Sequence, residues 1–365
     1  MERFPRVLVD LAALAQNLEV IRAAAPGCEI MAVIKANAYG HGMVAVARAL
    51  EKADALAVAR ISEAIALREA GISGEIVLLE GVFSSEELVL AAQHRLTLVL
   101  HNEQQIDWLE AFRGGTRFRC WLKIDTGMHR LGISMQDSAS AMRRVRGCPA
   151  ISQPPGLMTH LASAEIEGDP LTKKQLEDFS LLCEAWPGEV SSANSAAVFL
   201  RPLARRGWIR PGLALYGVSP LPEVTGADLG LRPAMRFETR IISIKTLSAG
   251  DAVGYNSTWT ATAPTRIGIA AVGYGDGYLR GFANGAPALV ANEQAQLVGR
   301  VSMDMIALDL GPGSEAGIGD PVLLWGPELP VEKIAPWAST IPYELLCNVS
   351  ARVHTEYLPA PVAMA

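Results

Sequence analysis

Cysteine is scarce in this sequence, and its few copies are scattered. The five cysteines form no Cys-x-x-Cys pair and no pair at metal-ligand spacing: they are Cys28, Cys120, Cys148, Cys183 and Cys347. An odd, dispersed set is a poor disulfide framework, which favours a reducing compartment. We therefore expect a cytoplasmic protein without a metal site.

Long apolar runs and basic clusters are also missing. The longer charge-free stretches, such as Gly147–Ala164, are interrupted by Pro, Gly or His, unlike a membrane span. The first residues, Met1–Pro5, are charged and do not lead into the apolar core of a signal peptide. Lys and Arg total 32 against 38 Asp and Glu, a net charge of −6. Such a chain binds nucleic acid and anionic membranes poorly, so we expect neither as a partner.

Apolar material is plentiful. Hydrophobic residues make up 50% of the 365 residues and charged residues 19%, which is enough for a large core and excludes disorder. The 33 glycines and 22 prolines follow no fixed period, which excludes a fibrous repeat. The length suggests two domains, although a single barrel can use about 250 residues.

Short apolar runs alternate with helix-like segments in the first part of the chain. The runs predict eight strands, at Glu29–Ile34, Ala55–Ala59, Glu75–Glu80, Leu96–Leu100, Arg119–Ile124, Gly156–Leu161, Val190–Ala193 and Ile209–Tyr216. The segments between them predict helices at Met43–Lys52, Ser62–Glu69, Ser84–Gln93, Glu103–Phe112, Gln136–Arg146, Thr172–Ala185 and Ala196–Leu203. Strands that are apolar on both faces and alternate with helices indicate a parallel sheet covered by helices.

Eight such units in roughly 200 residues predict an α/β fold of the (β/α)8 TIM-barrel type. A doubly wound open sheet is the competing fold, and the lack of a Gly-x-Gly-x-x-Gly motif after the first strand disfavours it.

The pattern changes near Pro233. Later strands are predicted at Phe237–Thr246, Arg266–Val272, Ala288–Val290, Gln296–Val298, Met305–Leu310 and Pro321–Leu324, joined by turns rich in Gly, Pro and Asp. A run of strands with few helices predicts a mostly-β C-terminal domain. We therefore divide the chain into domains 1–232 and 233–365. Whether the short strand expected at Arg6–Asp10 pairs with the second domain is left open.

A lysine ends the first apolar run of the barrel, in the segment Ala32–Gly42, which reads AVIKANAYGHG. In a barrel this position places Lys35 at the carboxyl-terminal mouth, where catalytic groups gather. The pKa of a lysine amine shifts readily, which suits Schiff-base chemistry. From strand position alone, a lysine that extends from a strand end into solvent is the commoner case.

Further motifs follow in a fixed order along nearly the whole chain. They are Trp121–Gly132 (WLKIDTGMHRLG), Ala193–Ala197, Arg210–Gly212, Val253–Tyr255, Gly273–Gly277, Gly299–Met305 and Ile341–Glu344. Together with the lysine segment, this ordered set resembles the alanine racemases, a family of enzymes that use pyridoxal 5'-phosphate (PLP). The resemblance implies a PLP-binding barrel followed by a β domain, a homodimer, and alanine as substrate.

The resemblance also implies a two-base mechanism. Racemisation removes the Cα proton of alanine from one face and returns a proton to the other, so it needs two acid–base groups. Lys35 matches the lysine that holds PLP as a Schiff base, and Tyr255 matches the tyrosine that the partner subunit supplies. By this match, Lys35 serves D-alanine and Tyr255 serves L-alanine. PLP is the electron sink, and the protein supplies orientation and electrostatics.

Arg210 matches the arginine that faces the ring nitrogen of PLP. A guanidinium stays protonated and donates, so the ring nitrogen stays unprotonated and the electron sink is weaker than with a carboxylate partner. A weaker sink should limit side reactions such as transamination. His160 matches a histidine that supports this arginine, although a lone histidine at a strand end is often only structural.

The phosphate group needs donors near the last strands of a barrel. Ser195 and the backbone at Gly212 and Leu213 are in the right part of the chain, where free N–H groups at a helix start bind anions. By the family match, the hydroxyls of Tyr39 and Tyr343 join them.

The resemblance extends to the substrate. Arg130 matches a residue near the phenolic oxygen of PLP and the substrate carboxylate. Lys123 matches a lysine that is carbamylated in much of the family, where the resulting anion orients that arginine. Met303 matches a partner-subunit residue whose backbone N–H holds the carboxylate, with Asp304 beside it. The residues expected to line the entrance are Tyr274, Arg280 and Arg300.

Other functions remain open. A racemase for another amino acid, such as serine or lysine, would share the fold. A PLP-dependent decarboxylase has a related barrel and β domain, but the Tyr255 and Arg210 matches argue against it. A PLP-binding homeostasis protein is a single barrel, so the second domain argues against it. The physiological direction, D-alanine synthesis for cell-wall precursors or D-alanine catabolism, is also left open.

Overall fold

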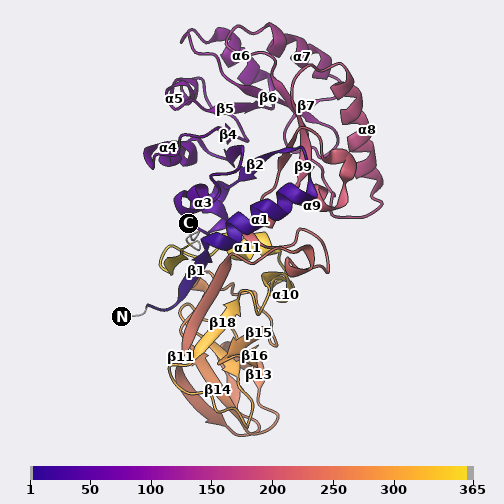
Figure 1. The fold of residues 1–365 in the computed structure, drawn as a ribbon. Coiled ribbons are helices and arrows are strands. Elements are labelled where there is room, and N and C mark those ends of the chain that lie inside the picture. Colours follow the sequence, from indigo (N-terminus) through magenta and orange to yellow (C-terminus); the bar gives the residue numbers. More distant parts are fainter. Residues whose placement is uncertain (1–2, 360–365) are drawn as a thin grey trace, which may run out of the picture.

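The computed structural model describes residues 3–359 and has two parts stacked along one long axis (Figure 1). The strands of the first part are β2 (Glu29–Val33), β3 (Ala55–Val58), β4 (Ile76–Leu78), β5 (Thr97–Leu100), β6 (Cys120–Asp125), β8 (Gly156–Met158), β9 (Val190–Asn194) and β10 (Trp208–Arg210). They pair in parallel in the order β5-β4-β3-β2-β10-β9-β8-β6, and β5 also pairs with β6, which closes the sheet. The predicted (β/α)8 barrel is confirmed.

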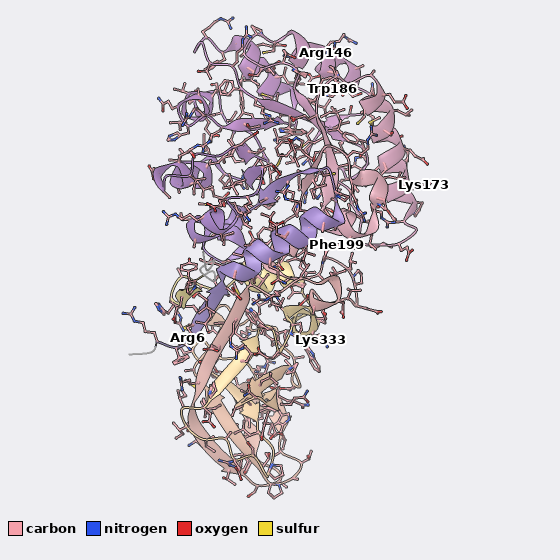
Figure 2. The ribbon with its side chains drawn as sticks, in the orientation of Figure 1. Arg6, Arg146, Lys173, Trp186, Phe199 and Lys333 are labelled. Carbon is pink, nitrogen blue, oxygen red and sulfur yellow. The ribbon has the colours of Figure 1, made fainter. Side chains whose placement is uncertain are left out.

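Helices cover the outside of this barrel (Figure 1). They are α1 (Leu11–Ala24), α3 (Met43–Ala49), α4 (Ile61–Glu69), α5 (Glu87–Gln93), α6 (Glu103–Ala111), α7 (Ser138–Gly147), α8 (Pro170–Glu184) and α9 (Ser195–Leu200), with the 3₁₀ turn η1 (Pro202–Ala204). The short segment α2 (Lys35–Tyr39) and the 3₁₀ turn η2 (Leu213–Tyr216) lie instead at the carboxyl ends of the barrel strands, and the short strand β7 (Ile133–Ser134) pairs with β6. Arg146 and Lys173 mark the outer helices α7 and α8 in Figure 2. No helix within residues 3–359 combines the length and apolarity needed to cross a membrane.

Two local predictions in the barrel differ from the structure. Helix α1 was not predicted, although Asp10 caps it by accepting from the N–H of Ala13 at 3.0 Å and its apolar stripe is buried. The last barrel strand was predicted over Ile209–Tyr216, but it ends at Arg210. Pro211 has no N–H to continue the ladder, and the chain then turns at Gly212 into η2.

The second part is mostly β, as predicted. Its main sheet has the order β14-β17-β16-β15-β18-β11-β1-β19, with an additional pairing of β14 to β11. The strands are β1 (Arg6–Asp10), β11 (Met235–Leu247), β14 (Thr265–Ala270), β15 (Pro287–Val290), β16 (Glu293–Val298), β17 (Ile306–Asp309), β18 (Pro321–Trp325) and β19 (His354–Leu358). The shorter elements are β12 (Ala252–Val253), β13 (Trp259–Thr260), η4 (Tyr255–Ser257), η5 (Tyr274–Asp276), α10 (Val331–Ile334), η6 (Ala335–Ala338) and α11 (Pro342–Cys347), and the 3₁₀ turn η3 (Ala227–Leu229) lies just before this part.

The first strand of the chain lies in this second sheet. β1 pairs antiparallel with β11 and parallel with β19, so the chain starts in the lower part of Figure 1 before α1 leads into the barrel. The buried amide of Asn17 on α1 then holds the end of the first part in place. Its Nδ2 donates to the carbonyls of Leu215 at 3.0 Å and Arg232 at 2.8 Å, and its Oδ1 accepts from the N–H of Arg232 at 2.7 Å. These contacts fix η2, which borders the site described next, against the segment that connects both parts.

Candidate active site

A cavity of about 490 Å³ opens at the carboxyl ends of the barrel strands. Ten of the residues singled out in the sequence line it: Lys35, Tyr39, Lys123, Arg130, His160, Ser195, Arg210, Gly212, Leu213 and Tyr343. They come from different strand ends and, for Tyr343, from α11 of the second part. Parallel strands place their carboxyl ends at one rim, which is why residues so far apart in the sequence meet here.

The turn after Lys35 is left-handed. Four consecutive residues, Ala36 to Tyr39, have φ between +52° and +54°, and none of them is glycine. This conformation costs roughly 1–2 kcal/mol for each L-residue, so the surrounding structure must hold it. Gly40 follows at φ +81°, where a Cβ would lie 2.2 Å from the carbonyl oxygen of Leu346. The turn therefore requires glycine at this position and packs tightly against α11.

Tyr39 is the last residue of this turn, and its ring packs between those of two other tyrosines at tilted angles. Its ring centroid lies 4.8 Å from that of Tyr216 and 5.8 Å from that of Tyr343. Burial, together with the nearby Tyr343 and Cys347, raises the pKa of the Tyr39 hydroxyl well above its ordinary value. Tyr39 therefore stays protonated and can donate a hydrogen bond into the cavity.

Gly212 and Ser195 form one wall of the cavity. The Oγ of Ser195 accepts from the N–H of Gly212 at 2.9 Å and from the N–H of Ala214 at 3.3 Å. A Cβ on Gly212 would lie 2.5 Å from the hydroxyl oxygen of Tyr39. The lack of a side chain at Gly212 thus keeps backbone N–H groups and two hydroxyls close together, which suits an anion with several oxygens.

Arg210 is buried at the end of β10. Its guanidinium donates to the Oγ of Ser191 and the carbonyl of Thr159, both at 2.5 Å, and its Nη2 lies 3.5 Å from Nδ1 of His160. Burial lowers the pKa of Arg210 to about 10, so it remains a cation near neutral pH. The pKa of His160 lies well below its ordinary value, because the ring is buried and faces Arg210 and other cations. His160 is therefore neutral beside a fixed guanidinium.

Lys123 shares the cavity with three other cations. Burial is the largest cause that lowers its pKa to about 8, followed by repulsion from Arg210, Arg130 and Lys35. A part of the Lys123 amines is therefore neutral near pH 8. The cavity as a whole is positively charged and suits an anionic ligand.

Six residues singled out in the second domain, all within residues 3–359, lie outside the wall of this cavity: Tyr255, Tyr274, Arg280, Arg300, Met303 and Asp304. Tyr255 is 67% exposed and Met303 52% exposed. The turn η5 holds the loop that carries Met303. The N–H of Tyr274 donates to the carbonyl of Ser302, and the N–H of Gly275 donates to the carbonyl of Met303. This set faces solvent in the single chain.

Sequence reasoning missed several residues of the cavity wall, among them Glu80, Asn194 and Cys347. Asn194 caps α9 by accepting from the N–H of Ala197 at 3.0 Å, and its place directly before Ser195 was the available signal. Glu80 stood at the end of a predicted strand, where barrel sites are built. The sequence carried no local signal for Cys347.

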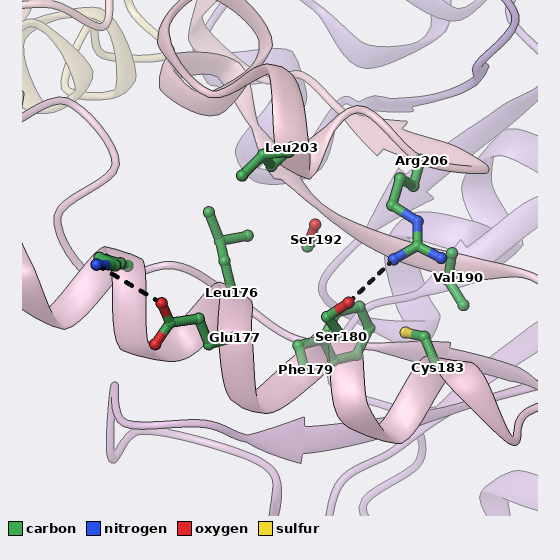
Figure 3. A pocket seen from close by; sticks show the side chains of 10 residues that line it. Leu176, Glu177, Phe179, Ser180, Cys183, Val190, Ser192, Leu203 and Arg206 are labelled. Carbon is green, nitrogen blue, oxygen red and sulfur yellow. Dashed lines mark hydrogen bonds and ion pairs between the residues drawn. The ribbon is translucent and has the colours of Figure 1, made fainter.

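A separate cavity of about 300 Å³ lies on the outer face of the barrel, between α8 and the segment 190–206 (Figure 3). Its lining is largely apolar, and Arg206 points across it toward Ser180, whose Oγ accepts from Nη1 at 3.4 Å. None of the candidate site residues predicted from the sequence lines it.

Comparison with known proteins identifies the family. The family model described as "Alanine racemase, N-terminal domain" matches residues 9–220, and the one described as "Alanine racemase, C-terminal domain" matches residues 234–357. The chain belongs to the alanine racemase family. The two matched ranges correspond to the barrel and to the β part, except that the first strand, β1, precedes residue 9 for most of its length.

Relatives in this family match almost end to end. The alanine racemase of Nitrosococcus oceani is 52% identical over 351 residues, 96% of this chain and 98% of that protein. The biosynthetic alanine racemase of Escherichia coli is 43% identical over 353 residues, again 96% and 98%. The crystal structure of the biosynthetic alanine racemase from Pseudomonas aeruginosa superposes with a TM-score of 0.94 at 43% identity, over 97% of this chain and 99% of that one.

Proposed function

We propose that this chain interconverts L- and D-alanine, with PLP bound in the cavity at the barrel mouth. The observation that carries the proposal is the cavity itself, which gathers a lysine, a buried arginine and the Ser195–Gly212 wall at one rim. Full-length relatives named alanine racemase support the reaction. The biosynthetic names of two relatives favour D-alanine synthesis as its direction.

The residues of the cavity fit PLP. Its phosphate suits the wall where Gly212 leaves room beside Tyr39, with the Ser195 hydroxyl, the N–H groups of Gly212 and Leu213, and the Tyr343 hydroxyl around it. Four cations and a volume of about 490 Å³ match an anionic cofactor with a small amino acid. Bound there, PLP would supply the electron sink that makes the α-proton of alanine removable.

Lys35 and Tyr255 are the two acid–base groups of the proposal. Lys35 holds the cofactor and moves a proton to and from Cα on one face of the substrate. The hydroxyl of Tyr255 from the partner subunit does the same on the other face. Arg210, kept cationic and supported by neutral His160, would lie beside the ring nitrogen of bound PLP and donate to it without giving up a proton, which would limit transamination.

A homodimer completes the site in this proposal. Tyr255, Tyr274, Met303, Met305 and Ile341 are large apolar residues that the single chain leaves 40–67% exposed. Such exposure on a folded domain is typical of a surface that another chain covers. A partner seated here would bring the backbone N–H of Met303, with Asp304 beside it, to a substrate carboxylate near Arg130, past an entrance lined by Tyr274, Arg280 and Arg300.

The proposal also covers the domain division and the compartment. We assign residues 1–232 to the PLP-binding domain and residues 233–365 to the β domain, with the strand Arg6–Asp10 contributed to the second sheet. Residues 1–2 and 360–365 lie outside the described part of the chain. The five cysteines are free, which supports a cytoplasmic location.

Cofactor content and activity test this function directly. The purified protein should carry PLP that borohydride reduction fixes to the peptide containing Lys35, and it should racemise L-alanine much faster than L-serine or L-lysine. A protein that carries PLP at another lysine, or that prefers serine or lysine, would contradict the proposal.

A further inference from the structure

Glu63, a residue of α4 that sequence reasoning did not single out, touches the turn after Lys35. Its Oε1 accepts from the N–H of Ala36 at 2.7 Å. Its Oε2 accepts from the N–H groups of Ala59 at 2.9 Å and Arg60 at 3.0 Å. One carboxylate therefore bridges the chain after β2 and the chain after β3, which are neighbouring strands of the barrel.

The bridge acts on the part of the backbone that is strained. Ala36 is the first of the four residues with φ near +53°, and it directly follows Lys35. The other end of the turn is held by a second side chain. Nδ1 of buried His41 lies 3.1 Å from the carbonyl oxygen of Ala38 and 2.9 Å from that of Tyr39. Two side chains thus hold the two ends of a conformation that the residues would not adopt alone.

Lys35 directly precedes this turn, and Tyr39 is its last residue. Lys35 and Tyr39 both line the cavity, whereas Glu63, within the described chain, is not among the lining residues. Glu63 therefore cannot act on the ligand directly. It can act only through the backbone that it holds.

We propose that Glu63 is a positioning residue for the reaction: its carboxylate, by bridging Ala36 to Ala59 and Arg60, fixes the left-handed turn that aims Lys35 and Tyr39 into the cavity. This inference rests on the proposed attachment of PLP at Lys35. It differs from a role in starting α4, where Glu63 is the third helical residue, because a capping box accepts Glu and Gln alike. The bridge needs both side-chain oxygens as acceptors, and glutamine has only one.

Glu63→Gln separates the two roles, with Glu69→Gln on the exposed side of the same helix as the matched control. The bridge predicts faster amide hydrogen exchange in residues 36–42 for Glu63→Gln. It also predicts a lower fraction of PLP fixed at Lys35 by borohydride and a kcat for alanine about 10–100-fold lower, since small misplacements of this kind carry such costs. KM should change much less than kcat, and both variants should keep a thermal midpoint close to that of the parent.

Glu63→Asp keeps two acceptor oxygens and should retain more activity than Glu63→Gln. If Glu63→Gln matches Glu69→Gln in exchange, PLP attachment and kcat, the inference is wrong even though PLP is on Lys35. If instead the parent protein carries PLP elsewhere, the proposed function fails, while the exchange measurement still reports on the bridge. If Glu63→Gln lowers the thermal midpoint while the protein that remains folded keeps the kcat of the parent, Glu63 acts in folding alone, and this result would also overturn the inference.

Discussion

Lys35 lies in the barrel cavity, whereas Tyr255 lies on the exposed surface of the β part. Lys35 lines the cavity at the barrel mouth, and Tyr255 is 67% exposed and lies outside the cavity wall formed by the described residues. A reaction that needs one acid–base group on each face of the substrate needs a second group besides Lys35. In the proposed function this second group is Tyr255 of a partner chain.

The attachment of the cofactor is the first prediction. Lys35→Ala should lose both covalent PLP and racemisation, because Lys35 is the lysine that the proposal assigns to the cofactor, whereas Lys123, which also lines the cavity, is assigned to orienting Arg130. Borohydride reduction with peptide mapping, together with an assay of alanine turnover, measures both effects. Lys52→Ala, an exposed change, should leave both unchanged. Continued turnover by Lys35→Ala with a reducible adduct would contradict the assignment.

Arg210 gives the second prediction. Arg210→Glu places a carboxylate near the proposed ring nitrogen and favours its protonation, so racemisation should fall while pyruvate formed by transamination rises. The ratio of the two products under identical conditions is the measurement. The exposed outer-face variant Arg206→Glu is the matched control and should keep the parent ratio. An unchanged ratio in Arg210→Glu would mean that this arginine does not face the ring.

The lowered pKa of Lys123 gives a prediction about stability. Its folded pKa of about 8 lies below the ordinary value of 10.5, so between these pH values the unfolded chain holds a proton that the folded chain lacks. The free energy of unfolding should therefore rise as the pH rises from about 8 to 10.5. Urea denaturation in CO₂-free buffer should show this rise in the parent and less of it in Lys123→Met. Equal pH dependence in both proteins would argue against the shifted amine.

Much of the barrel and of its site could be predicted from the sequence. Apolar runs and their spacing gave all eight barrel strands, and the place of Lys35 at a strand end led to the cavity. The left-handed turn at Ala36–Tyr39 could not be predicted, because alanine and tyrosine carry no sign of a positive φ, and one asparagine, although that residue type is enriched at positive φ, does not indicate a run of four such residues. Glu63 was missed because its partners are backbone N–H groups that come close only after β2 and β3 pair.

Tyr255→Phe tests the second base separately. The change keeps the ring and removes the hydroxyl that transfers the proton, and loss of such a group typically costs about 10²–10⁴-fold in rate. Racemisation of L-alanine should fall by this order. D-Alanine should still exchange its α-hydrogen with solvent deuterium through Lys35, as proton NMR can follow. Equal loss of exchange for both enantiomers would contradict the division of roles between Lys35 and Tyr255.

Subunit mixing tests the central claim most directly. Inactive Lys35→Ala and inactive Tyr255→Phe chains, each with a different affinity tag, are exchanged, and the doubly tagged heterodimer is purified. If Tyr255 serves the partner's cavity, one site of the heterodimer carries both lesions and the other pairs an intact Lys35 with an intact Tyr255. Alanine racemisation should then return to about half of the parent activity for each dimer. A verified heterodimer that remains inactive would show that Tyr255 acts within its own chain or is not the second base.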